Sequence, residues 1–174
     1  MNRLSVYVIE ESLAAEWLRS VLVRDLGDFV EVTVGHSASD LLRLFRERSA
    51  PDAIFIQRVI DYGAEVLQEY PAFDFNDESR EYAGSSILRL IDDHLDLHHM
   101  HVVLINDGLG YAEAKADKAT KYLRERGLLA AEYQKPFDVT QLITDFCVRF
   151  SLTNPYPPLS DWAPEDSIIV EDCP

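Results

Sequence analysis

The sequence predicts an α/β fold built around one parallel β-sheet. Short apolar segments rich in β-branched residues alternate five times with longer segments of helical periodicity. The segment 53–56 is apolar throughout and lies between two helical segments, which is typical of a strand buried on both faces. Turn-forming and capping residues separate most segments. This alternation implies parallel strands joined by helical crossovers.

The first half of the chain contains three predicted strands and two predicted helices. Short β-branched segments mark the strands, at residues 4–9, 29–34 and 53–57. Apolar residues at helical spacing mark the helices, at residues 13–26 and 37–48. Ser12 is a candidate N-cap of the first helix, and Gly27 ends it. Ser37 or Ser39 caps the second, and Pro51 ends it because proline pushes the preceding residue out of the helical conformation.

The second half contains two more predicted strands and three more predicted helices. The strands lie at residues 101–105 and 128–133. The helices open at 84–86, run over 111–126, and extend from Asp138 or Thr140 to Phe150. The segment 58–83 predicts a short helix near 64–67 and a loop over 71–78. A loop this long in a compact domain is uncommon and often functional.

Five strand–helix repeats predict the flavodoxin-like arrangement, in which the strands are ordered 2-1-3-4-5 and helices cover both faces of the sheet. That order brings the carboxyl ends of the first, third, fourth and fifth strands around one crevice. In open parallel sheets the chemistry lies just beyond those ends. Gln57 follows the apolar run of the third strand, so it is expected at the middle of this rim.

Composition and charge narrow the class of protein. With 174 residues, 47% of them hydrophobic, the chain is long enough for one domain with a substantial core. The net charge of −15 disfavours nucleic acid as a partner, because binding a phosphate backbone needs a basic face. There is no apolar run of about eighteen residues to span a membrane, and no secretory signal. Cys147 and Cys173 are therefore expected as reduced thiols of a cytoplasmic protein.

The strand–helix alternation stops near residue 150. We predict one domain over 1–150, with 58–83 as an extended connection after the third strand, and an acidic, proline-rich tail over 151–174. A partly ordered tail is the simplest interpretation. Docking of Trp162 or of residues 168–170 on this domain or on a partner is the alternative.

Polar residues follow four of the predicted strands. They are Glu10 and Glu11 after the first strand, Gln57 at the end of the third, Asn106 after the fourth and Lys135 after the fifth. Because the carboxyl ends of parallel strands meet at one edge, these side chains are expected to lie close together. The plainest interpretation is a satisfied polar cluster that fixes the strand ends.

On these positions, residues 3–150 resemble the receiver domain of bacterial response regulators. Glu10 and Glu11 stand where that family has an acidic pair, and Lys135 followed by Pro136 matches its lysine–proline motif. In the family the acidic pair holds Mg²⁺, and an aspartate that ends the third strand accepts a phosphoryl group. The lysine and a hydroxyl on the fourth strand contact the phosphoryl oxygens.

The sequence departs from the family at the positions that carry this chemistry. Position 57 is Gln, and an amide oxygen is too weak a nucleophile to form an acyl phosphate. Asn106 stands in place of the serine or threonine. Glu132 replaces the aromatic residue three positions before the lysine, and Tyr133 is one position away. The resemblance therefore implies a degenerate, pseudo-receiver domain that lacks the phosphoacceptor aspartate.

These departures change the expected charge balance of the pocket. Glu10 and Glu11 face Lys135 without a third anion, so Lys135 can pair directly with one glutamate. The amides of Gln57 and Asn106 can donate to either carboxylate. Mg²⁺ favours carboxylates together with a phosphate oxygen, so Glu10 and Glu11 are only weak candidate metal ligands. We expect no metal, no cofactor and no catalytic residue, and therefore no enzyme.

Two alternatives to this interpretation rest on other residues. A displaced aspartate, Asp61, Asp74 or Asp77, could fold over the pocket and accept phosphate, although Asp61 would need a considerably longer strand. Four histidines fall close together, at positions 94, 98, 99 and 101, and His94 and His98 are one helical turn apart. Their acidic neighbours and their place near a helix end favour a solvated surface over a metal site.

The function we expect is that of a non-phosphorylatable regulatory module that acts by protein–protein interaction. In the family, the face of the fourth helix, fifth strand and last helix makes dimers or meets effectors. Lys118, Lys121, Glu132 and Tyr133 lie on the matching segments, and the lysines could steer an acidic signalling partner or a second copy. The alternatives are a phospho-switch with a displaced aspartate, or a small-ligand-binding flavodoxin-like protein that uses 58–83 as a lid.

Overall fold

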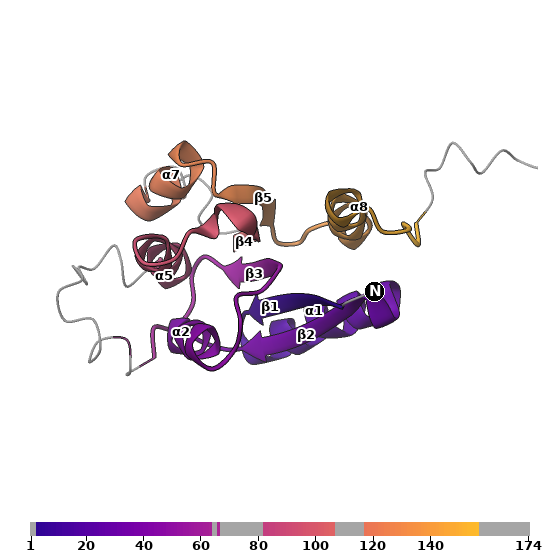
Figure 1. Cartoon of the computed structure of the whole chain (residues 1–174), viewed down its shortest axis with the longest axis horizontal. Helices are drawn as coiled ribbons and strands as arrows, with labels where there is room; N and C mark the ends of the chain where they lie inside the picture. The colour runs from indigo at the N-terminus through magenta and orange to yellow at the C-terminus, as the bar shows by residue number, and fades with distance from the viewer. Residues whose placement is uncertain (1–2, 64–65, 67–81, 107–116, 157–174) are drawn as a thin grey trace, which may run out of the picture. The chain divides into compact units, whose positions relative to one another are not determined.

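The computed structural model describes residues 3–63, 66, 82–106 and 117–156, and their strands form one five-stranded sheet in the order β2-β1-β3-β4-β5 (Figure 1). All neighbouring strands are parallel. The strands are β1 (Leu4–Ile9), β2 (Val30–Gly35), β3 (Ala53–Gln57), β4 (His101–Asn106) and β5 (Leu129–Gln134). The predicted fold class and strand order are confirmed.

The helices of the described residues follow the strands in alternation. They are α1 (Ser12–Leu26), α2 (Ala38–Glu47), α5 (Ala83–Asp92), α7 (Lys118–Glu125) and α8 (Val139–Phe150), with the short 3₁₀ helices η1 (Gly27–Phe29) and η2 (Leu97–His99). The chain divides into two compact units, Met1–Phe137 and Asp138–Pro174. The sheet and α1 to α7 belong to the first unit, and α8 belongs to the second. The predicted domain limit at residue 150 stays a prediction.

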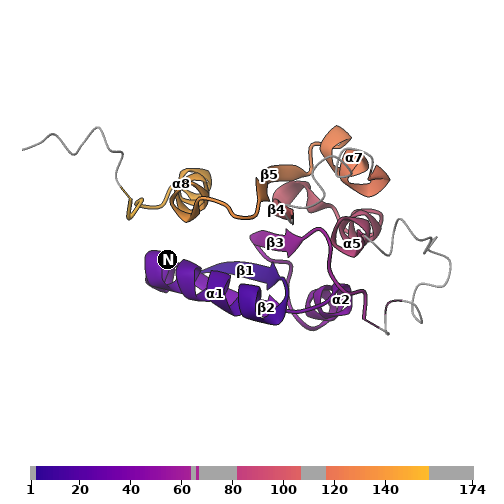
Figure 2. The ribbon, with the colours of Figure 1, turned by 180° about the vertical axis from the view of Figure 1, so that it is seen from behind.

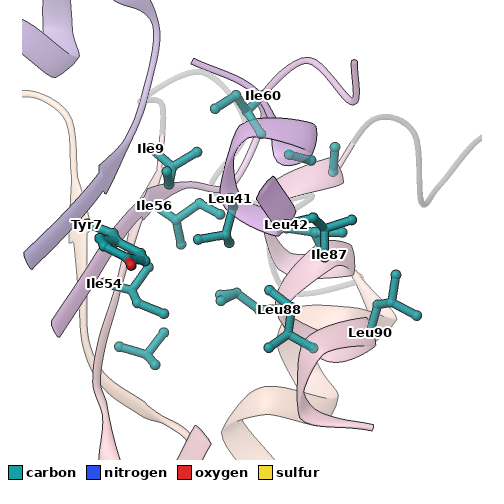
Figure 3. Packing of buried hydrophobic residues seen from close by; sticks show 14 of the residues in the cluster. Tyr7, Ile9, Leu41, Leu42, Ile54, Ile56, Ile60, Ile87, Leu88 and Leu90 are labelled. Carbon is teal, nitrogen blue, oxygen red and sulfur yellow. The ribbon is translucent and has the colours of Figure 1, made fainter. Parts of the chain in front are cut away.

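One hydrophobic core lies between the sheet and the helices α2, α5 and α7. Alternate strand residues point into it, among them Tyr7, Ile9, Ile54 and Ile56, because successive side chains of a strand face opposite sides (Figure 3). The helices contribute a continuous apolar face, which includes Leu41, Leu42, Ile87, Leu88 and Leu123. Burying one such aliphatic side chain stabilises the fold by roughly 2 kcal/mol. The core therefore fixes these three helices on one face of the sheet.

The opposite face of the sheet is covered by α1, which lies along β1 and β2 (Figure 2). The remaining strand residues, such as Val8 and Phe55, are buried on this side, as are Leu18 and Leu22 of the helix. Every residue of β3 is buried, which is why its sequence is apolar without alternation. Among the described residues, no helix has the length and apolar character that crossing a bilayer requires.

The strand β5 closes one edge of the sheet and carries an irregularity. Val102 pairs with Leu129 but Val103 pairs with Ala131, so the register shifts by one residue between them. Beyond the shift, Glu132 pairs with Leu104 and Tyr133 pairs with Ile105. Glu132 therefore lies on the face of α5 and α7, and Tyr133 on the face of α1.

Helix capping follows the sequence in part. The Ser37 side chain caps α2 by accepting a hydrogen bond from the backbone N–H of Asp40, and Asp138 caps α8. The prediction for the first helix was wrong by one residue, because Glu11 is the N-cap and Ser12 is already helical. Of the predicted helix over 111–126, residues 111–116 lie outside the described residues, and Asp117 is not helical. Asp117 is extended and caps α7 with its side chain, since a carboxylate there binds the free amides of the first turn.

The second unit is described from α8 onward. Leu142, Ile143, Phe146 and Cys147 are the buried residues of α8, and the rings of Phe146 and Phe150 lie 4.7 Å apart. Cys147 is a free thiol whose pKa is raised by burial, so it stays protonated at neutral pH. Cys173 and the residues of the predicted tail from 157 onward lie outside the described residues.

The connection between β3 and α5 begins and ends beside the carboxyl end of β3. The backbone N–H of Arg58 donates to the carbonyl of Ile105 at 2.8 Å, and Gly84 donates to the carbonyl of Arg58 at 2.9 Å. A Cβ on Gly84 would lie 1.9 Å from the carbonyl oxygen of Gln57, so only glycine allows α5 this approach. Val66 is buried, and the rest of the predicted helix at 64–67 and the loop at 71–78 lie outside the described residues.

Replacing Gly84 with alanine should therefore destabilise the protein. Helix propensity alone would make Gly84→Ala stabilising by about 1 kcal/mol, but forced overlap with the Gln57 carbonyl should lower the free energy of unfolding by about 2 kcal/mol or more. Urea denaturation measures the difference. Gly127→Ala is the comparison, because it meets no atom within 4 Å and costs only backbone strain. A Gly84→Ala variant as stable as the parent would contradict the close approach.

Candidate functional site

The sheet topology brings four of the expected polar residues to one edge. Ile9 pairs with Ile56, Gln57 with Ile105, and Asn106 with Gln134. Glu10, Gln57, Asn106 and Lys135 therefore end four neighbouring strands in spatial order. The backbone N–H of Lys135 also donates to the carbonyl of Asn106 at 2.8 Å, which fixes the lysine just past the end of β5.

The central contact of this edge is an ion pair between Glu10 and Lys135. The Nζ of Lys135 lies against Oε1 of Glu10, whose side chain is 2% exposed, while that of Lys135 is 29% exposed. The other carboxylate oxygen of Glu10 accepts a hydrogen bond from the backbone N–H of Glu11 at 2.8 Å. Both oxygens are thus engaged by the protein itself. The prediction that Lys135 pairs directly with one glutamate is confirmed.

Glu11 does not join this cluster. It is exposed, it is the N-cap residue of α1, and it forms no ion pair with any described residue. The expectation that both glutamates face Lys135 was therefore wrong for Glu11. The physical reason is local: the chain turns into α1 directly after Glu10, so the second side chain points to solvent.

The two amides of the edge are both buried. Gln57 is 1% exposed and Asn106 is 3% exposed. The Oδ1 atom of Asn106 accepts no hydrogen bond within the described residues, and no bond joins Asn106 to Glu10. The suggestion that Asn106 donates to a carboxylate is thus not borne out. An unmade hydrogen bond at a buried amide costs about 1–3 kcal/mol unless water supplies it.

The residues present do not fit a magnesium site. Mg²⁺ needs near-octahedral oxygen ligands and usually binds through one or two carboxylates. Here the ammonium group of Lys135 already pairs with the carboxylate of Glu10, and residue 57 supplies an amide in place of a carboxylate. Within the described ranges, no group of three histidine, cysteine or acidic side chains is arranged to hold a metal ion.

Asp61, one of the candidates for a displaced phosphoacceptor, is bound to the start of α2. The carbonyl oxygens of Asp61 and Tyr62 accept hydrogen bonds from Ala38 and Ser39, at 2.9 Å each, so this segment is tied to the start of α2. The carboxylate of Asp61 accepts from the backbone N–H of Gly63 at 3.2 Å. No ion pair joins it to Lys135. Asp74 and Asp77 lie outside the described residues.

The four histidines do not converge. His94, His98 and His99 are exposed, whereas His101 is buried at the start of β4. His99 lies 3.6 Å from Asp96, which is also the N-cap of η2. Hydrogen bonding by the backbone N–H of His98 lowers the pKa of Asp96.

On the expected interaction face, Glu132 is tied to α7. Its carboxylate takes two hydrogen bonds from the guanidinium of Arg124, at 2.5 and 2.6 Å. This two-point geometry orients both side chains. Tyr133 lies on the other face of the sheet. The centre of its ring lies 5.9 Å from the centre of the Phe137 ring, and the Phe137 ring centre lies 6.0 Å from that of Trp17.

Several basic side chains on and just after α7 pair with acidic neighbours of this same chain. Arg124 pairs with Glu132, Lys121 lies 3.7 Å from Glu125, and Arg126 lies 3.2 Å from Asp92. Lys118 and Lys121 are exposed, so they contribute charge to the surface. The hydroxyl of Tyr122 donates to Asp92 at 2.9 Å, and this bond raises the pKa of Tyr122.

Sequence reasoning missed a buried ion pair beside the site. Arg58, the residue after Gln57, is 3% exposed, and its Nε lies 3.5 Å from Oδ2 of Asp117, which is 2% exposed. The signal for Arg58 was an arginine directly after a strand that was predicted to be buried on both faces. Its partner could not be named, because Asp117 lay inside a segment that was predicted to be helical.

Solved structures of receiver domains resemble this chain. A response regulator receiver domain protein from Clostridium thermocellum is 18% identical, with a TM-score of 0.55 over 86% of this chain and 94% of its own. A response regulator receiver protein from Burkholderia phymatum is 15% identical, with a TM-score of 0.57 over 88% of this chain and all of its own. The signal receiver domain of an HD domain-containing protein from Pseudomonas fluorescens Pf-5 is 14% identical, with a TM-score of 0.57 over 86% and 96%.

Sequence comparisons add nothing to this likeness. No family model matches the chain, and no curated protein matches it. Identities of this size show the fold, so the chain has a receiver-like fold, and its function is a matter for proposal.

Breaking the Glu10–Lys135 pair should destabilise the protein. Lys135→Met leaves a buried carboxylate without a counter-charge, and we expect the free energy of unfolding at neutral pH to fall by about 2 kcal/mol, since partial exposure of Lys135 softens the penalty. Adding Glu10→Gln to this variant should recover at least half of the loss. Lys121→Met is the control, because its pair with Glu125 is exposed and should cost about 0.5 kcal/mol or less. Equal stabilities of Lys135→Met and the parent in urea would contradict the pairing.

Proposed function

We propose that this chain is a receiver-like signalling module that works by binding a protein partner and carries no phosphoryl group on residue 57. The observation that carries the proposal is the charge state of the rim. Gln57 offers a neutral amide at the buried end of β3, and Lys135 is committed to Glu10. Among the described residues, the two buried or half-buried charges of the pocket, Glu10 and Lys135, therefore balance each other without an added anion or cation.

The chemistry of residue 57 supports this proposal most directly. An acyl phosphate forms when a carboxylate attacks the donor phosphorus, and a neutral amide oxygen is too poor a nucleophile for that attack. The neighbouring acids do not replace it. Glu10 is engaged by Lys135 and by a backbone amide, and Asp61 is bound into the start of α2.

A role in binding fits the surface of α7 and β5 better than a role in catalysis. Exposed Lys118, Lys121 and Glu132 lie on these elements. The hydroxyls of Ser85 and Thr120, which donate to Asp117, are buried, so they are not offered to a substrate at this surface. We propose that a protein partner, or a second copy of the chain, docks on this surface with its charges complementary to it.

Treatment with a small phosphodonor tests the first part of the proposal. Acetyl phosphate with Mg²⁺ should add no phosphoryl group to the protein, as judged by intact mass and by Phos-tag gels. Gln57→Asp is the positive control, because it restores a carboxylate at the same buried position. A phosphorylated parent protein whose label disappears in Asp61→Ala would establish the displaced-aspartate alternative and end this proposal.

Charge reversal tests the proposed surface. Lys118→Glu together with Lys121→Glu should weaken self-association, or the affinity for an identified partner, by about tenfold. Sedimentation velocity measures the first quantity and calorimetry the second. Arg19→Glu with Arg24→Glu on α1 is the matched control, since it makes the same change of net charge on another helix. An equal effect of both double variants would show that net charge alone is responsible.

A further inference from the structure

A buried polar network links the end of β3 to the start of α7. Arg58 lies with its guanidinium carbon 4.1 Å from the centre of the Tyr82 ring, and its Nε faces Asp117 at 3.5 Å. Its backbone is fixed as well, through hydrogen bonds with Ile105 and Gly84 at 2.8 and 2.9 Å. The guanidinium is thus held between the sheet and two helices.

Asp117 is the point at which this network meets α7. One carboxylate oxygen accepts from the backbone N–H of Ala119 at 2.9 Å. The other accepts from the hydroxyl of Ser85 at 2.7 Å, from the hydroxyl of Thr120, and from the backbone N–H of Thr120 at 3.3 Å. Asp117 therefore caps α7, bonds to α5 and pairs with Arg58, which directly follows β3, at the same time.

The other end of α7 is held in the same manner. Arg124 binds Glu132 of β5 at two points, and Arg126 and Tyr122 both reach Asp92 at the end of α5. Each end of the helix is thus tied both to a strand and to α5. Between them, Leu123 is fully buried in the core.

We infer that the Arg58–Asp117 pair keeps α7 in one fixed position without any modification of residue 57, so that the surface of α7 and β5 is permanently formed. The regulatory meaning of this inference rests on the proposed function, because it names what holds the proposed docking surface in shape. A module that changed state by a shift of this helix would need α7 free to move. Here Arg58 directly follows β3, next to the pocket, and its buried charge faces the N-cap of α7 at 3.5 Å, an ion pair without a hydrogen bond at Nε.

The energetics favour a positioning role over a simple gain in stability. A buried ion pair is often no more stable than an apolar replacement, because desolvation of both charges offsets their attraction. Removing one partner is costly, because it leaves an unpaired buried charge. Such a pair therefore selects one arrangement of the segments that carry it, and here these are the chain directly after β3 and the start of α7, with α5 bonded to Asp117.

Amide hydrogen exchange on the full chain tests the inference. Asp117→Asn retains a good N-cap and removes the charge, so it separates the ion pair from helix capping. We expect exchange within Lys118–Glu125 to become about tenfold faster, with the exchange of α1 unchanged. Arg58→Met should act in the same way, and the double variant should move back toward the parent rate, because the two residues act through each other.

Arg19→Met is the control, since it removes an exposed ion pair with Glu16 from α1 and should leave α7 unaffected. Unchanged exchange in α7 of Asp117→Asn would overturn the inference. Equal acceleration in α1 and α7 would also overturn it, because it would mean a general loss of stability. If Arg58→Met does not fold, Asp117→Asn decides the question alone.

The outcome is separable from that of the proposed function. The exchange experiment uses neither a phosphodonor nor a partner. If α7 proved to be loosely held, the argument from Gln57 would still stand. If the parent protein were phosphorylated, the proposed function would be ruled out, regardless of how fast the amides of α7 exchange.

Discussion

The ion pair between Glu10 and Lys135 is the contact on which the rest of the site depends. A buried carboxylate must find a counter-charge or become protonated, because leaving water costs an isolated anion several kcal/mol. Lys135 supplies that charge from the end of β5, across the ends of β3 and β4, and a backbone amide engages the second oxygen. With these bonds made, the charges of Glu10 and Lys135 offset each other, and the carboxylate of Glu10 is already engaged at both oxygens.

Much of the fold, and part of the site, could be predicted from the sequence. The apolar run of β3 and the five-fold alternation predict the sheet order, since parallel strands with short connections allow few topologies. The polar ends of the strands predict which residues meet. The orientation of Glu11 could not be predicted, because it depends on where α1 begins. Asp117 was missed for a related reason: its capping role appears only once the helix is known to start at Lys118.

The close approach of Gly84 and the position of Arg58 beside the pocket depend on each other. Gly84 brings α5 into contact with the carbonyl of Gln57, and Arg58 uses that closeness to stack on Tyr82 and reach Asp117. Both contacts tie helices to the end of β3 through atoms next to residue 57. On the proposed function, which needs no chemistry at this position, fixed contacts can fill the space around residue 57 and hold the proposed surface in one form.

The most direct test of the central claim is a titration of the protein with Mg²⁺ and beryllium fluoride, a phosphoryl analogue that binds carboxylates, followed by amide NMR. If the rim is closed by its own ion pair, the amide signals of Glu10, Gln57, Asn106 and Lys135 will not move beyond the general effect of salt. Saturable shifts confined to these four residues would mean that the pocket still accepts a cation and an anion, and would contradict the account.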